Sequence, residues 1–253
     1  MLVSRAPARQ RPRAADDLVI AGLVPMSTVD WPDHLTATVF LQGCPWNCFY
    51  CHNQALIPVR VPGLVAWQEV RDLLARRRRL LDGVVFTGGE ALRQDALADA
   101  AREVIDMGFA VGLHTAGPYP RRLHDMVERG LVDWVGLDIK ALPEHYAQVV
   151  GRPNSAPKAW QCLQVLLEAA ADGGPDFEVR TTVVPGDVTA DDAVEVARRV
   201  HEAGARVYAL QQARGEGTTG RFAVVAPGWD AACERMAERI EALGWDRFTY
   251  RPA

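Results

Sequence analysis

The sequence predicts an α/β fold, an open, TIM-like partial (β/α)6 barrel with parallel strands inside and helices outside. Three observations support this prediction. Short runs rich in β-branched and aromatic residues alternate with segments of helical period, as in right-handed βαβ units. Six such units are found, whereas a closed barrel of this kind has eight. The central strands are apolar on one face only, unlike strands of a sheet that helices cover on both faces.

The predicted elements follow one another without a linker or a short repeat between them. Strands are expected at 35–42, 83–87, 109–114, 133–139, 177–184 and 206–212. Helices are expected at 66–81, 93–107, 119–129, 158–172, 190–203 and 229–243. The chain has 253 residues, so one domain can hold all these units, and we expect residues 17–253 to form it. Residues 1–16, which carry prolines and arginines, are expected to be a flexible basic tail.

Two strands indicate what lies inside the barrel. Along 133–140, small or polar residues share one face and aliphatic residues share the other, and 177–184 repeats the alternation. This pattern fits helices outside and a wet or ligand-filled interior. Ligands of such folds bind at the carboxyl ends of the strands. The side chains expected there are Thr87, His114, Asp138, Lys140, Arg180 and Gln211.

Composition excludes several classes of partner. A net charge of −4 gives no global basic field with which to hold nucleic acid or an anionic membrane. No apolar run approaches the roughly 20 residues of a membrane span. The basic start of the chain lacks the apolar stretch of a secretory signal, although an organelle-import sequence is an alternative. We therefore expect a cytoplasmic protein that binds neither nucleic acid nor membrane.

Three of the five cysteines, Cys44, Cys48 and Cys51, form a C-x3-C-x2-C pattern directly after the first predicted strand. Glycine and proline there oppose a helix, so a loop is expected that can wrap its thiolates around one centre. A Cys3His zinc site would need His52, but adjacent side chains seldom reach one metal together. Unligated core cysteines are a second alternative. The third is an iron–sulfur cluster, in which three thiolates leave one iron open to bind a small molecule.

The cysteine loop, residues 43–53, resembles that of the radical S-adenosylmethionine (SAM) enzymes, including an aromatic residue, Tyr50, before the last cysteine. Gly88-Gly89-Glu90, after the second strand, is similar to the family's GGE motif. Asp138-Ile139-Lys140, and Arg180 with the VVPG run that follows it, resemble the glycyl-radical activating enzymes. The runs STVDWP, VFLQGC and CHN look most like the activating protein of anaerobic ribonucleoside-triphosphate reductase, at residues 27–32, 39–44 and 51–53.

This resemblance implies a 4Fe-4S cluster, with Cys44, Cys48 and Cys51 as both its ligands and the catalytic residues, and SAM bound at the open iron. The implied reaction is reductive cleavage of SAM, after which the radical formed takes a hydrogen from a glycine of a partner enzyme. The implied partners are the anaerobic ribonucleoside-triphosphate reductase, as protein substrate, and a flavodoxin- or ferredoxin-type electron donor.

The resemblance also implies which residues contact SAM. The two glycines let the backbone come close to its methionine part, and Glu90 is expected to meet its ammonium. Asp138 and Lys140 offer opposite charges for a zwitterion, or Asp138 helps to hold a cation, and Arg180 binds the carboxylate. Each also has a structural interpretation, as turn glycines or internal ion pairs. The full set of expected contacts is Tyr50, His52, Gly88, Gly89, Glu90, His114, Thr115, Asp138, Lys140, Arg180 and Gln211.

Three positions depart from the family pattern. Ala91 follows GGE, where proline is commoner. His114 stands where activating enzymes usually have an aspartate near the ribose or a cation, and it is alternatively a hydrogen-bonded strand-end residue. No histidine follows the sixth strand, so Gln211 or Gln212 is expected to serve there.

Two other functions stay open at this point. A radical SAM enzyme with these motifs can act on another glycyl-radical enzyme or on a small molecule. From another class, the cysteines can belong to an iron–sulfur or zinc binding module without enzymatic activity.

Overall fold

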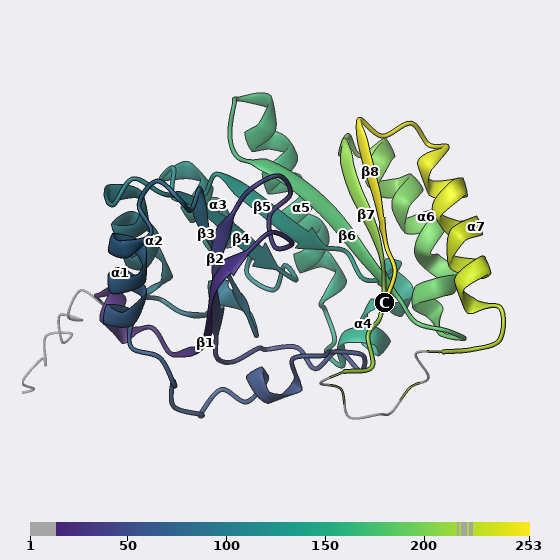
Figure 1. Ribbon diagram of the computed structural model, residues 1–253. Coiled ribbons are helices and arrows are strands. Elements are labelled where there is room, and N and C mark those ends of the chain that lie inside the picture. The colour runs from purple at the N-terminus through teal and green to yellow at the C-terminus, as the bar shows by residue number, and fades with distance from the viewer. Residues whose placement is uncertain (1–13, 217, 219–221, 223–224) are drawn as a thin grey trace, which may run out of the picture.

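The computed structural model describes residues 14–216, 218, 222 and 225–253. Among them, a curved sheet of eight strands in sequential order is flanked on its outer side by helices, as an open barrel (Figure 1). β1 pairs antiparallel with β2, and every later neighbour pair is parallel. The predicted α/β fold is therefore confirmed, with a correction: the sheet has more strands than the six predicted, and one runs antiparallel.

The strands are β1 (Ile20–Ser27), β2 (Thr36–Leu41), β3 (Gly83–Gly88), β4 (Ala110–Thr115), β5 (Trp134–Asp138), β6 (Asp176–Val183), β7 (Val207–Gln212) and β8 (Arg247–Arg251). The α-helices are α1 (Trp67–Arg76), α2 (Leu97–Asp106), α3 (Pro120–Glu128), α4 (Pro143–Val150), α5 (Ala156–Ala171), α6 (Val188–Glu202) and α7 (Trp229–Glu241). Short 3-10 helices are η1 (Ala15–Asp17), η2 (Gln54–Leu56) and η3 (Ala91–Arg93).

The six predicted strand–helix units correspond to β2 to β7 with α1, α2, α3, α5, α6 and α7. The helix expected at 93–107 begins later, at Leu97, because η3 precedes it. Among the strands and α-helices, β1, β8 and α4 were not predicted. The predicted tail lies largely outside the described residues, and its last two residues belong to η1.

The register of the parallel strands brings polar residues together inside the barrel. Asp138 of β5 pairs with Arg180 of β6, and Thr182 of β6 pairs with Gln211 of β7. The alternate residues, such as Leu137, are fully buried against the helices. The predicted division into a polar inner face and an apolar outer face is therefore confirmed, and it places polar groups at the strand ends.

The connection between β1 and β2, residues 28–35, closes the amino end of the barrel, and we call it the plug. Its Trp31 is 5% exposed and stacks on Trp134, with ring centroids 5.6 Å apart. Gly112 of β4 makes room for it, since a Cβ there would lie 2.8 Å from the Trp31 ring. Asp33 of the plug pairs with Arg247 of β8 at 2.6 Å, so the plug also ties the two edges of the sheet.

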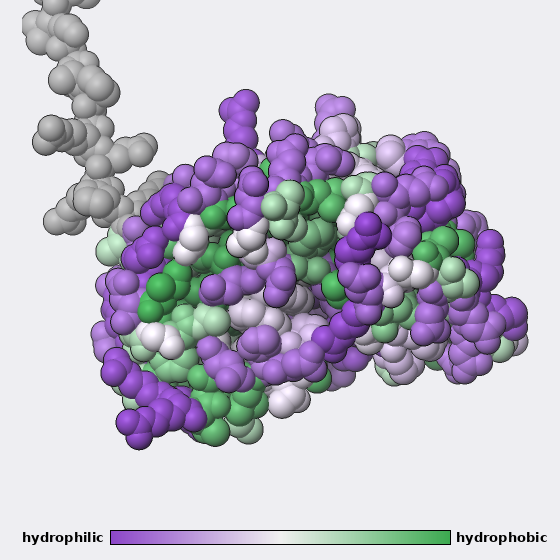
Figure 2. Space-filling model, turned by 90° about the horizontal axis from the view of Figure 1, so that it is seen from above, coloured by the Kyte–Doolittle hydropathy of each residue, from purple (hydrophilic) through white to green (hydrophobic). Residues whose placement is uncertain are grey.

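The amino end of the barrel is the face seen in Figure 2. Hydrophilic residues dominate this face, and apolar residues show between them. No helix within the described residues is long and apolar enough to span a membrane.

Candidate active site

The cysteine loop follows the carboxyl end of β2. Its start is held by backbone bonds, in which Gly43 N donates to Leu56 O at 2.8 Å and Cys44 N donates to Ile57 O at 3.0 Å. All three of its cysteines have free thiols, and Cys48 is buried. The loop therefore carries its thiols at the end of the barrel opposite the plug.

Burial raises the pKa of these thiols. It raises the pKa of Cys44 to about 12 and that of Cys48 to about 11, and it also raises the pKa of Cys51. The charges of Cys48 and Cys51 contribute to the shift at Cys44, so the three sulfurs are electrostatic neighbours. Thiols of this kind are protonated at neutral pH, and metal binding is the means by which such ligands lose their protons.

The spacing of the thiols bears on what they can hold. Zinc needs all its ligands around one point, at about 2.3 Å for each sulfur. Within the described residues no three His, Cys, Asp or Glu side chains converge on such a point. In an iron–sulfur cube each thiolate instead binds a different corner. Three cysteine sulfurs from one loop are the donors that such a cluster takes.

Glu90 is a buried carboxylate at the turn after β3. Its Oε1 accepts from Thr115 Oγ1 at 2.8 Å and from Leu92 N at 3.2 Å, and its Oε2 accepts from Ala116 N at 3.0 Å. Burial raises its pKa to about 7, and no side chain of the described residues forms an ion pair with it. A nearby cation would favour the charged form of this buried carboxylate, so the site suits a ligand ammonium.

The two glycines before Glu90 are required by the chain itself. Gly88 has a φ of 115°, and a Cβ there would lie 2.3 Å from Leu41 N. A Cβ on Gly89 would lie 2.6 Å from Gly43 O. At these glycines the backbone therefore comes close to β2 and to the cysteine loop. This approach places Glu90 beside Cys44.

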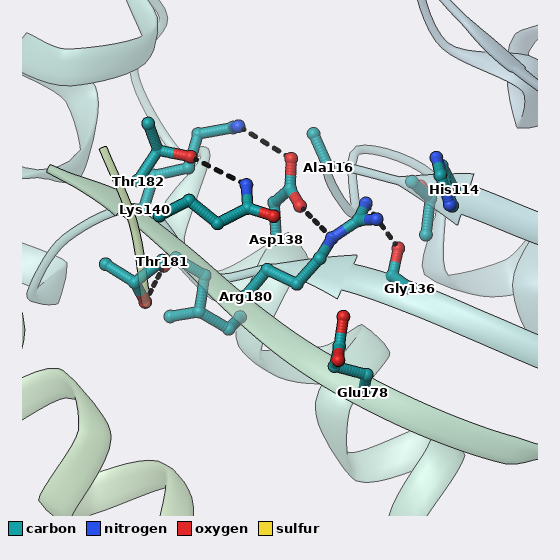
Figure 3. A network of polar contacts seen from close by, with 12 residues as sticks. His114, Ala116, Gly136, Asp138, Lys140, Glu178, Arg180, Thr181 and Thr182 are labelled. Carbon is teal, nitrogen blue, oxygen red and sulfur yellow. Dashed lines mark hydrogen bonds and ion pairs between the residues drawn. The ribbon is translucent and has the colours of Figure 1, made fainter. Parts of the chain in front are cut away.

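Asp138 lies between two cationic side chains (Figure 3). Lys140 Nζ donates to its Oδ2 at 3.0 Å, and Arg180 Nε donates to its Oδ1 at 2.9 Å. Burial alone would raise the pKa of Asp138, but the charges of Lys140 and Arg180 lower it. Arg180 also donates to Gly136 O at 3.2 Å. Asp138 and Arg180 thus form an internal ion pair, with Arg180 directed at this carboxylate.

His114 and Thr115 end β4 with different tasks. His114 Nε2 lies 2.7 Å from the carbonyl oxygen of Asp30 in the plug, so the ring donates there. Burial, followed by the charge of Arg180, lowers the pKa of His114 to about 3, which keeps the ring neutral. Thr115 instead holds Glu90. The structural interpretation of His114, as a hydrogen-bonded residue near the end of its strand, therefore describes its contacts.

Gln211 contributes to a second polar group on the inner face. Its Nε2 donates to Thr182 Oγ1 at 3.2 Å, and its Oε1 accepts from Arg251 Nη1 at 2.9 Å. Arg251 of β8 also donates to Glu178 Oε2 at 2.9 Å. Glu178 Oε1 is buried without a hydrogen-bond partner in the described structure.

The remaining expected contacts lie on the cysteine loop. The Tyr50 side chain is buried, and the Lys140 ammonium lies 5.5 Å from its ring centroid. His52 is exposed. The structure therefore brings Tyr50 toward the Asp138 ion pairs but leaves His52 at the surface.

Sequence patterns missed two residues that support this region. Tyr146 of α4 is fully buried, packs edge-on against Trp46 of the cysteine loop, and donates to Asp138 O at 3.3 Å. Arg251 belongs to the unpredicted β8. The signals available for α4 were Pro143 at its start and Gly151 directly after its end.

Comparison with known families adds a decisive match. Residues 38–200, more than half of the chain, match the family described as the radical SAM superfamily. The chain belongs to the radical SAM superfamily. Enzymes of this superfamily use a 4Fe-4S cluster and SAM, and the chain is an enzyme of this kind.

Its relatives include activating enzymes. A protein of Methanocaldococcus jannaschii that carries the name "putative glycyl-radical enzyme activating enzyme" is 28% identical over 195 residues, covering 77% of this chain and 79% of that protein. The pyruvate formate-lyase-activating enzyme of Clostridium pasteurianum is 28% identical over 181 residues, covering 69% of this chain and 71% of that protein. Both support placing the chain among the glycyl-radical activating enzymes of the superfamily.

Solved radical SAM structures share the fold at low sequence identity. SuiB of Streptococcus suis, bound to S-adenosylmethionine, has a TM-score of 0.62 at 9% identity over 83% of this chain. This chain spans 48% of SuiB, about half its length. TYW1 with a lysine–pyruvate adduct has a TM-score of 0.59 at 13% identity, covering 82% of this chain and 73% of that one.

Proposed function

We propose that the chain is a radical SAM activating enzyme that generates a glycyl radical on anaerobic ribonucleoside-triphosphate reductase. One observation carries the site assignment: one loop holds three free thiols, and beside its Cys44 lies a buried carboxylate, Glu90, that has no ion-pair partner among the described residues. Thiolates suit iron, and such a carboxylate suits the ammonium of a bound amino acid.

In this proposal Cys44, Cys48 and Cys51 hold the 4Fe-4S cluster. When bound, the cluster supplies the electron that cleaves SAM reductively and so yields the radical. The chain supplies placement and the exclusion of water. Glu90 holds the ammonium of the methionine part, and Thr115 with the Ala116 amide fixes the Glu90 carboxylate.

The Asp138 ion pairs have a second task in the proposal. Lys140 carries its ammonium between Asp138 and the ring of Tyr50, directly behind the cysteine loop. Its positive charge lowers the pKa of Cys48, which otherwise rises through burial. Lys140 therefore favours the thiolate that the cluster needs, and Asp138 keeps Lys140 in place.

The choice of the reductase rests on the resemblance of three runs, at 27–32, 39–44 and 51–53. The first of these runs forms most of the plug, where Trp31 stacks on Trp134 and the Asp30 carbonyl accepts from His114. Its contacts are therefore made within this chain and support its own fold. A pyruvate formate-lyase is the second candidate partner, because the activating enzyme of Clostridium pasteurianum is among the relatives. A cytoplasmic location and a flavodoxin- or ferredoxin-type donor stay predictions.

The experiment begins with anaerobic reconstitution. About four irons per chain are expected, and one zinc per chain would contradict the cluster. With dithionite, the loaded enzyme should cleave SAM to 5′-deoxyadenosine, and Cys48→Ala should abolish this cleavage. An Arg78→Met variant should retain this cleavage, because Arg78 is an exposed residue that follows α1.

Mixing the loaded enzyme with each candidate partner then identifies the substrate. An electron paramagnetic resonance doublet of a glycyl radical is expected with the anaerobic reductase and SAM. A doublet that forms with pyruvate formate-lyase alone would transfer the assignment to the second candidate. SAM cleavage without a doublet on either protein would contradict both.

A further inference from the structure

The middle of the cysteine loop is held by α4, an element that sequence patterns did not predict. Asn47 N donates to Val150 O at 3.0 Å, and Phe49 N donates to Val149 O at 3.4 Å. These two amides flank Cys48 on either side. The backbone that carries Cys48 is therefore tied to the end of α4, whereas the start of the loop is tied to residues 56–57.

The end of α4 is suited to this contact. The last carbonyl groups of an α-helix have no partner within the helix, and here the cysteine loop supplies two amides for them. Gly151 follows with a φ of 65°, in the left-handed conformation that ends helices. A Cβ at this position would lie 3.3 Å from Asn47 O, so a glycine also allows the loop to approach.

Arg152 adds a side-chain contact. Its Nε donates to Pro45 O at 3.0 Å, although the residue is exposed. A charged donor makes a stronger bond to a carbonyl than a neutral one does. Pro45 lies between Cys44 and Cys48, so this bond fixes the part of the loop that the α4 carbonyls do not reach.

Tyr146 links the same helix to the Asp138 ion pairs. Its ring packs against Trp46 with centroids 5.9 Å apart, and its hydroxyl lies 3.3 Å from Asp138 O and 3.4 Å from Lys140 N. The amino end of α4 is anchored in turn, because Leu142 N donates to Asp192 of α6 at 3.0 Å. The helix therefore has firm support from which to hold the loop.

We propose that the carboxyl end of α4 and the two residues after it, together residues 149–152, position the cysteine loop for cluster binding, with Arg152 as a positioning residue that fixes the backbone between Cys44 and Cys48. Because the bonds join groups of the chain itself, they act with or without iron. The proposal rests on the assignment of the cluster to the three cysteines and is independent of which partner the enzyme activates.

The test compares Arg152→Met, which keeps the length and loses the donor, with Arg152→Lys, which keeps a charged donor. Arg78→Met serves as the matched control, since Arg78 is also exposed and lies after α1. Two rates are measured: loss of iron from the reconstituted enzyme to a chelator, and alkylation of Cys48 by iodoacetamide in the iron-free chain, read by mass spectrometry.

Loss of one charge-assisted bond should raise both rates about threefold to tenfold in Arg152→Met. Arg152→Lys should recover part of the difference, and Arg78→Met should match the wild type. Rates in Arg152→Met equal to those of the wild type would overturn the proposal. A wild-type chain that takes up no iron would contradict the cluster assignment instead, while alkylation of the iron-free chain would still decide the role of Arg152.

Discussion

At Asp138 three charges meet on the inner face of the barrel, and their balance determines what the site can bind. The carboxylate holds Lys140 and Arg180, which are both largely buried. Burial lowers the pKa of a lysine, yet the charge of Asp138 more than offsets this effect and raises the pKa of Lys140. The ion pairs therefore keep two cations charged in a place that would otherwise disfavour them.

Removal of this carboxylate should be costly for the fold. Asp138→Asn leaves the two buried cations without their counter-charge, so the free energy of unfolding of the iron-free chain should fall by about 3–5 kcal/mol. Urea unfolding at neutral pH measures it. Glu195→Gln, in an exposed group of ion pairs on α6, should hardly change the midpoint. Equal midpoints for the two variants would contradict this account of Asp138.

The same balance predicts how the site responds to salts. Both oxygens of Asp138 already accept from cationic side chains, and Gly136 O accepts from Arg180. A free metal cation would have to displace them. We therefore expect the affinity for SAM, measured by equilibrium dialysis, to be equal in potassium and in tetramethylammonium salts of the same ionic strength. A strong requirement for potassium would show that Arg180 leaves Asp138 when SAM binds.

Glu90 predicts a pH effect on stability. Its pKa is raised by burial from 4.5 to about 7, so between these values the folded chain keeps a proton that the unfolded chain has released. Stability of the iron-free chain should therefore fall as pH rises through this window. Thermal unfolding from about pH 5 to about pH 8 should show the Tm of the wild type falling relative to the Tm of Glu90→Gln. Parallel curves for the two proteins would refute the raised pKa.

At the scale of elements, the plug explains why the barrel needs no further strands to close its amino end. Trp31 fills the space between β3, β4 and β5, where Gly83 and Gly112 leave room for its ring. The plug carries the STVDWP run, so a motif that resembles one group of activating enzymes has a packing role here.

Truncation of the plug's aromatic ring measures this role. Trp31→Ala should lower the free energy of unfolding by about 3–5 kcal/mol, because a buried ring is replaced by a cavity. Val29→Ala, two residues earlier and 81% exposed, should have little effect. Chemical denaturation of both iron-free variants makes the comparison. If Trp31→Ala were as mild as Val29→Ala, the plug would not support the barrel.

The sequence predicted the six βα units because strand-type runs and segments of helical period alternate clearly over many residues. It missed β1, whose Gly22 and Pro25 are poor strand formers and whose residues 24–26 are exposed. It missed α4 because eight residues are too few to establish a helical period. The three cysteines and Glu90 could be expected from motifs, whereas the supporting contacts of Tyr146, Arg152 and Arg251 join elements far apart in the sequence.

At the scale of the whole molecule, the two unpredicted strands extend the sheet beyond the six units at both edges. β8 adds more than width, because Arg251 reaches across β7 to Glu178 of β6. Glu178 is 1% exposed, so this contact compensates a fully buried carboxylate. The last strand is thereby coupled to the centre of the barrel.

That coupling can be tested by a double-variant cycle. Arg251→Met should lower the free energy of unfolding by about 3 kcal/mol, since Glu178 then lacks its counter-charge. Adding Glu178→Gln should restore much of the loss, because the remaining amide carries no charge. Calorimetry of the single and double variants measures both effects. Additive losses would mean that the two side chains do not act as a pair.

The plug has one more consequence, which concerns how small molecules enter the barrel and leave it. Because the stacked rings of Trp31 and Trp134 fill the amino end, the end that carries the cysteine loop is where small molecules would enter and leave. A large protein that docks there to present its glycine would cover the same opening. The methionine and 5′-deoxyadenosine formed from SAM would then leave only after the partner protein dissociates. Dissociation of the two proteins would therefore end each round of activation.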